Sequence, residues 1–217
     1  MKRTQKLSWL MTGLLLLSSI TSSFSQTAKE FFNNTGIPLT YLGIDFYQAR
    51  LINDPNANAS DVKGRIYGSM NDVVVTEAKN YDIQGAFHRN VTSDLTAITA
   101  RNEKIDAKDI TSSNTADFNR LTEADIAAEI KALNLKGKDG YGLVFIMEGM
   151  KKEEKKSFGS VWVTLIDMKT KKVLMAERME QEATGIGFRN FWVSIIKKTI
   201  NEVEKRKGKA WKDKYGS

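Results

Sequence analysis

The chain has 217 residues, of which 41% are hydrophobic and 27% are charged, and it contains two prolines and no cysteine. This composition is typical of a globular protein, and the absence of cysteine excludes disulfides, thiol catalysis, thiolate zinc sites and iron–sulfur clusters. The formal net charge of +7 is concentrated at the two ends of the chain, so the body is close to neutral and nucleic acid is not an expected partner.

The N-terminal segment has the three-part layout of a secretory signal peptide. Three basic residues precede an apolar run over residues 7–20, and small polar residues follow it. The run is shorter than the roughly 20 residues that a transmembrane helix needs. We therefore predict a signal peptide over residues 1–25, cleaved after Ser25, and no transmembrane span in the mature form. The segment has no cysteine to carry a lipid, so we do not expect it to be a lipoprotein signal peptide.

The mature chain is long enough for one domain with a sizeable core. We predict a single α/β domain over residues 26–205 and a basic tail over residues 206–217. From Lys197 to the C-terminus, eight basic residues stand against three acidic ones. The excess of positive charge therefore lies in the last predicted helix and the tail.

The first part of the domain alternates clear and weak patterns. Period-two alternation predicts a strand over residues 39–47. Turn-forming residues over 53–61 then lead into a helix, with Ser60 as its predicted N-cap. Residues 80–119 carry only short apolar islands, which fit either an irregular helical region or a strand near residues 104–110.

The second part is more regular. Thr122 and Asp125 form a capping box that predicts the start of a helix. The continuous apolar run over residues 142–147 is typical of a strand buried on both faces. Alternation over residues 158–167 and 173–182, with a polar turn between them, completes a predicted three-strand meander.

The last predicted element is a long amphipathic helix after Gly187. Its apolar positions recur at helical spacing and are Phe188, Phe191, Trp192, Ile195, Ile196, Thr199, Ile200 and Val203. The predicted fold class is therefore α/β (α+β), with a mixed sheet that includes the C-terminal meander and with helices packed on the sheet.

This order of elements resembles the α/β domain of curli-secretion-type envelope proteins. The hairpin segment Val161–Leu174 carries the likeness, which covers residues 141–205. Those proteins have a glycine after the threonine of the turn, where this chain has Lys171. The segment Gly185–Trp192 is similar to one found in secreted bacterial proteins of unassigned function. The resemblance implies a fold and a compartment, and it implies no chemistry.

The turn before the last helix is a candidate ligand site. Its residues are Gly185, Gly187, Arg189 and Asn190. Backbone N–H groups at a helix start, beside an arginine, can bind an anion. A structural turn that needs positive φ explains both glycines equally well, and the third glycine of a dinucleotide fingerprint is missing.

The basic end of the chain is a second candidate. It could contact an anionic surface through Lys205, Arg206, Lys207, Lys209, Trp211 and Lys212. Lysines would meet phosphates or another anionic polymer, with the aromatic side chain at the interface. The alternative is a helix end whose lysines favour the negative end of the helix dipole.

Other chemistries have weak support. The oxygen-rich loop at residues 54–58 lacks the glycine and glutamate of a calcium loop. His88 is the only histidine, which leaves no pair for a zinc triad, and we expect it to face solvent. Asp45, Glu148 and Asp167 lie near predicted strand ends, but Asp167 is more simply a turn residue.

We therefore expect a non-catalytic exported envelope domain, in the periplasm or on the cell surface of a Gram-negative bacterium. Its partner would be another envelope protein or an anionic envelope polymer. The alternative is a domain that binds a small or phosphate-containing ligand at the turn over residues 185–190, with hydrolysis left open. We predict no catalytic residue, no metal and no cofactor, and the oligomeric state stays open.

Overall fold

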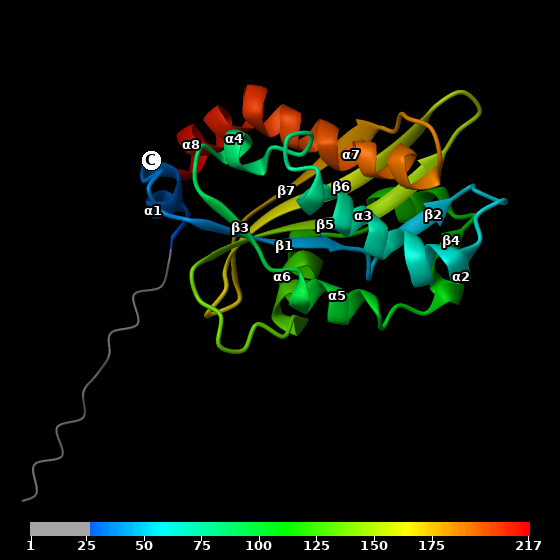
Figure 1. Cartoon of the computed structure of the whole chain (residues 1–217), viewed down its shortest axis with the longest axis horizontal. Coiled ribbons are helices and arrows are strands. Elements are labelled where there is room, and N and C mark those ends of the chain that lie inside the picture. Colours follow the sequence, from blue (N-terminus) through cyan, green and yellow to red (C-terminus); the bar gives the residue numbers. More distant parts are fainter. Residues whose placement is uncertain (1–26) are drawn as a thin grey trace, which may run out of the picture.

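The core of the fold is a seven-stranded mixed sheet within residues 27–217, the part of the chain that this computed structural model describes (Figure 1). The predicted signal peptide lies outside the described residues. The strands are β1 (Leu39–Asp45), β2 (Arg50–Ile52), β3 (Val91–Ser93), β4 (Thr111–Ser112), β5 (Tyr141–Lys152), β6 (Ser157–Asp167) and β7 (Lys172–Glu182). One edge of β5 pairs in parallel with β1 and β2, and the other pairs antiparallel with β6. The sheet continues through β3 beside β1, β4 beside β2 and β7 beside β6.

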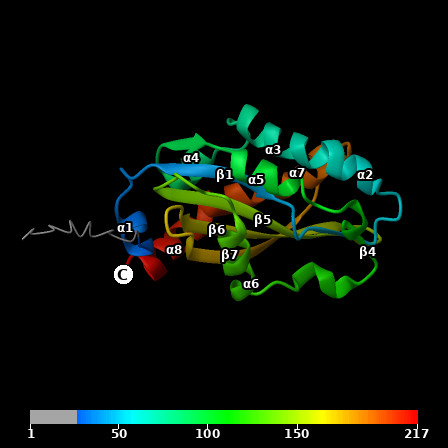
Figure 2. The same cartoon turned by 90° about the horizontal axis from the view of Figure 1, so that it is seen from below.

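Helices cover both faces of the sheet (Figure 2). They are α1 (Ala28–Asn33), α2 (Ala59–Asp61), η1 (Val62–Ile66), α3 (Tyr67–Thr76), α4 (Ile83–Phe87), α5 (Thr96–Asn102), η2 (Ala107–Asp109), η3 (Thr115–Asn119), α6 (Glu123–Ala132), α7 (Phe188–Glu202), η4 (Val203–Lys207) and α8 (Gly208–Tyr215). One apolar core lies under α1, α3, α4, α7 and α8, and a smaller one lies under α5 and α6. The predicted α/β class with helices packed on a mixed sheet is confirmed.

The predicted meander is present as β5, β6 and β7. Its second turn is organised by Asp167, whose Oδ1 accepts hydrogen bonds from the backbone N–H groups of Lys169 (2.9 Å) and Thr170 (3.1 Å). Lys171 has a φ of 57°, the left-handed conformation that glycine adopts most easily. The turn therefore keeps that backbone conformation without a glycine.

Two predicted helix starts have different outcomes. Thr122 and Asp125 form the predicted capping box, with each side chain bonded to the backbone of the other. The prediction for Ser60 is wrong, because Asn58 is the N-cap and its Oδ1 accepts a hydrogen bond from the N–H of Asp61 at 3.1 Å. Asparagine is as good an N-cap as serine, so the helix begins two residues earlier.

The amphipathic helix at the C-terminus is confirmed, and it is longer than predicted. In α7, Trp192, Ile196 and Ile200 are buried against the sheet. The helical backbone then continues through η4 and α8 to Tyr215. The predicted boundary at residue 205 therefore lies inside a continuous helical segment.

Two asparagine side chains complete the open edge of β1 beyond its short pairing with β3. The Oδ1 of Asn71 accepts the N–H of Ile44 at 2.6 Å, and the Oδ1 of Asn102 accepts the N–H of Phe46 at 2.9 Å. Gly43 has a φ of 118°, and a Cβ there would lie 2.8 Å from the Oδ1 of Asn71. Only glycine fits this close approach.

The first and last described helices pack against each other. The Nδ2 of Asn33 in α1 donates a hydrogen bond to the carbonyl of Gly216 at 2.6 Å, and the rings of Phe32 and Tyr215 stack with centroids 5.9 Å apart. Figure 1 shows α1 beside α8 at the end of the molecule where the C-terminus lies. These contacts therefore hold the first and last described helices together.

Candidate functional site

Three of the six residues predicted to contact an anionic surface have side-chain partners within the protein. Arg206 pairs with Glu202, and Lys207 pairs with Glu177 of β7. Trp211 is 1% exposed, and its Nε1 donates a hydrogen bond to the Oε2 of Glu177 at 2.5 Å. Lys207 and Trp211 therefore fix the last helix to the sheet, whereas the Arg206 pair lies within the helical segment itself.

The other three of these six residues are lysines whose side chains are exposed to solvent. Lys205, Lys209 and Lys212 are exposed and are spaced by four and three residues, which makes them neighbours on one side of a helix. Within residues 27–217, none of them forms an ion pair. We call these three side chains the lysine row.

A cavity of about 270 Å³ opens beside the lysine row, between α1, α4 and the helical segment of η4 and α8. Its lining includes four aromatic residues, which are Phe31, Phe32, Phe87 and Trp211. Two members of the lysine row, Lys209 and Lys212, also line it, together with His88 and Glu204. His88 is exposed, as predicted.

The wall of this cavity contains a buried arginine that the sequence analysis did not identify. Arg89 is 7% exposed, and its guanidinium carbon lies 3.6 Å from the centroid of the Phe31 ring. The Nη2 of Arg89 donates to the carbonyl of Phe31 and its Nε donates to that of Phe87, both at 3.0 Å. Burial lowers the pKa of the Arg89 guanidinium to about 10. Its hydrogen-bond acceptors are neutral carbonyls, so its charge has no carboxylate partner among the described residues.

The candidate turn before α7 lies elsewhere. Gly185 and Gly187 have φ values of 126° and 81°, so the turn needs both glycines for its backbone. The Nε of Arg189 donates to the Oδ1 of Asn190 at 3.0 Å. Three of these residues line a shallow hollow of about 240 Å³ that also includes Arg65, whereas Gly185 does not line it.

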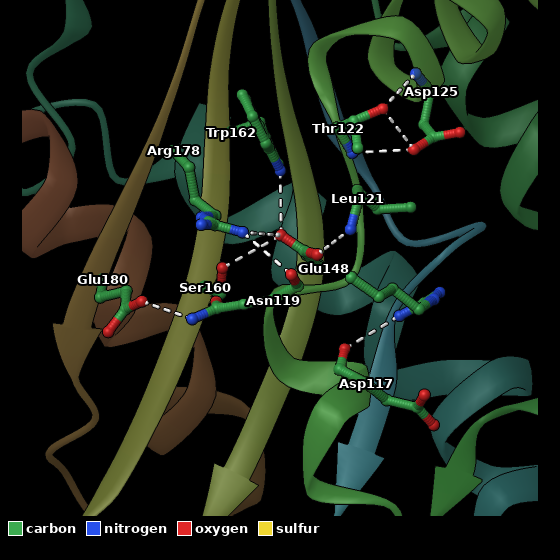
Figure 3. A network of polar contacts seen from close by, with 11 residues as sticks. Asp117, Asn119, Leu121, Thr122, Asp125, Glu148, Ser160, Trp162, Arg178 and Glu180 are labelled. Atoms are coloured by element: carbon green, nitrogen blue, oxygen red, sulfur yellow. Dashed lines mark hydrogen bonds and ion pairs between the residues drawn. The ribbon is translucent and has the colours of Figure 1, made fainter.

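The carboxylate of Glu148 is the centre of a buried polar network (Figure 3). Its Oε1 accepts the N–H of Leu121 at 2.5 Å, and its Oε2 accepts the Nε1–H of Trp162 at 2.9 Å. The hydroxyl of Ser160 lies 3.3 Å from Oε2, and the Nη1 of Arg178 lies 3.8 Å from it. The carboxylate therefore ties the segment after η3 to β5 and β6.

The other two predicted carboxylates also have structural partners. The Oδ2 of Asp45 lies 2.9 Å from the Nε of Arg101, which also pairs with Glu129. Burial raises the pKa of the Asp45 carboxyl, and the charge of Arg101 opposes this shift. Asp167 holds the β6–β7 turn. Within the described residues, no group of three or more histidine, aspartate and glutamate side chains could hold a metal ion.

The helices of the described residues are also too short or too polar to cross a membrane. The described residues thus form a mixed α/β domain with an aromatic cavity and a lysine row at one end. No protein-family model matches the chain, and no curated protein matches its sequence.

Among solved structures, the chain has distant similarity to bacterial proteins. A PelC dodecamer from Paraburkholderia phytofirmans is 13% identical, with a TM-score of 0.33, and the match covers 79% of this chain and 91% of that one. The hypothetical protein CT253 from Chlamydia trachomatis is 10% identical, with a TM-score of 0.37 and coverages of 80% and 97%. Lipoprotein GNA1162 from Neisseria meningitidis is 12% identical, with a TM-score of 0.32 and coverages of 78% and 98%. These similarities assign no family to the chain.

Proposed function

We propose that the protein is an exported, non-catalytic α/β domain that binds another component of the bacterial envelope. The signal-peptide layout of residues 1–25 supports export. The lysine row is the single observation that supports binding, because its three charges are exposed and have no acidic partner among the described residues. Such a row attracts an anionic polymer or an acidic protein surface.

Peptidoglycan sacculi, an anionic envelope polymer, provide a direct test. The full chain is expressed in a Gram-negative host and recovered from the periplasm, where its first residue should be Gln26. The triple variant with Lys205, Lys209 and Lys212 changed to Gln should bind sacculi about tenfold more weakly than the wild type. Wild-type binding should also weaken as salt is raised, because exposed charges are screened.

A matched variant controls for total charge. It carries Gln in place of Lys79, Lys104 and Lys155, which are exposed and lie outside the lysine row. This variant should bind sacculi as the wild type does. Equal binding by all three proteins would contradict the role of the lysine row, and a chain that stays in the cytosol with Met1 would contradict export.

A second candidate function uses the turn before α7. Two arginines, Arg65 and Arg189, flank the hollow there, and the first turn of α7 contains no acidic residue and no side-chain cap. These features favour a phosphate-containing ligand. Arg65 already pairs with Asp61, so Arg189 would be the main contact.

Thermal denaturation with glucose 6-phosphate tests this candidate. Wild-type protein should be stabilised as the ligand concentration rises above its dissociation constant, and Arg189→Ala should lose that stabilisation. Lys197→Ala removes an exposed charge from the same helix and should keep it. The absence of any stabilisation of the wild type would reject this candidate.

A further inference from the structure

The cavity between α1, α4 and α8 combines an apolar floor with a cationic rim. The floor consists of aromatic side chains from three separate elements. The rings of Phe87 and Trp211 stack with centroids 6.4 Å apart, and the rings of Phe31 and Phe87 meet edge to face with centroids 6.5 Å apart. Such a floor binds an apolar group by removing it from water.

Positive charge dominates the polar part of the lining. Lys209 and Lys212 are without ion pairs in the described chain, and Arg89 in the wall has only carbonyl acceptors. Glu204 is the one carboxylate of the lining. A buried charge without a charged partner is unfavourable, so an anion at this place would be stabilised.

We infer that this cavity binds a free, single-chain anion with an apolar body, of the kind represented by a medium-chain fatty carboxylate. The apolar body would lie on the aromatic floor, and the carboxylate would face Lys209 and Lys212. The volume of about 270 Å³ is near the lower end for ligand sites, which favours one chain over the two chains of a membrane phospholipid. The inference rests on the proposed function, because Lys209 and Lys212 belong to the lysine row.

Octanoate is the probe, and 1-octanol is its uncharged match. Each is titrated into the ¹⁵N-labelled mature protein while the amide signals of Gly208 and the indole signal of Trp211 are followed. Octanoate should shift both signals, and octanol should bind about tenfold more weakly because it lacks the charge. Lys209→Gln combined with Lys212→Gln should weaken octanoate binding about tenfold.

A variant that fills the mouth of the cavity tests the location. Thr35 is exposed and lines the cavity, so Thr35→Trp should remove octanoate binding and leave the fold intact. Thr76→Trp, at an exposed position outside the lining, is the matched control and should bind octanoate normally. Arg89 is not used as the test position, because its hydrogen bonds also hold α1 and α4 together.

Either of two results would overturn the inference. The first is an octanoate affinity no higher than that of octanol, and the second is full octanoate binding by Thr35→Trp. Phosphatidylglycerol vesicles that shift the Trp211 signal when octanoate does not would show a bilayer lipid to be the ligand, and would also overturn it.

The inference and the proposed function can fail separately. Thr35→Trp keeps all three lysines of the row, so it should retain sacculi normally while it loses octanoate. If sacculi binding requires the lysine row and octanoate does not bind, only the inference fails. If octanoate binds and sacculi retention does not depend on the row, only the proposed function fails.

Discussion

The Glu148→Ala variant should lose about 3–5 kcal/mol of unfolding free energy, because two donors lose their acceptor. The substitution leaves the N–H of Leu121 and the Nε1–H of Trp162 without their acceptor, and it removes the carboxylate that faces Arg178. Each donor left without an acceptor costs about 1–3 kcal/mol, whereas Arg178 is exposed and keeps its hydrogen bond to the carbonyl of Asn119. Urea denaturation followed by circular dichroism measures the loss.

Two variants of the same network give the comparison. Glu148→Gln keeps a side-chain oxygen that can accept one of these hydrogen bonds, so it should cost less than Glu148→Ala. Glu180→Ala removes an exposed carboxylate bonded to Asn119 and should change stability by no more than about 0.5 kcal/mol. If Glu148→Ala costs no more than Glu180→Ala, the network does not hold the segment after η3.

The Trp192→Ala variant should also lose about 3–5 kcal/mol, for a different reason. Trp192 has 0% exposure and its ring meets that of Phe191 with centroids 5.1 Å apart. Truncation would leave a cavity between α7 and the sheet, whose surroundings relax only in part. The same denaturation experiment measures the effect.

The two buried tryptophans of the last helix provide an internal control. Trp192 Nε1 has no hydrogen-bond partner in the described part of the chain, whereas Trp211 Nε1 is bonded to Glu177. Trp192→Phe therefore removes only packing, and Trp211→Phe also removes the partner of a carboxylate. A larger loss for Trp192→Phe than for Trp211→Phe would contradict this account.

The fold was predictable where a pattern persists over many residues. The meander and α7 have long strands and a sustained apolar stripe, so their periodicity identifies them. Residues 80–119 contain six short elements, α4, β3, α5, η2, β4 and η3. None is long enough to show a period, and tertiary contacts fix them, which is why the sequence left this region open.

The candidate site was only partly predictable because charge partners are a tertiary property. The sequence places Lys205 and Lys207 in one basic cluster, but Lys207 meets Glu177 of a neighbouring strand and Lys205 does not. Tryptophan is a residue type that is common at interfaces, but the side chain of Trp211 is 1% exposed and lies in the core. Arg89 gives no sequence signal, because it bonds the carbonyl of Phe31, far away along the chain.

The pairing of α1 with α8 also couples the two ends of the described domain. The stacking of Phe32 on Tyr215 and the hydrogen bond from Asn33 to Gly216 join segments that lie 183 residues apart in the sequence. Removal of either helix would leave the other without these contacts, so we expect the two ends of the domain to open together in amide hydrogen exchange.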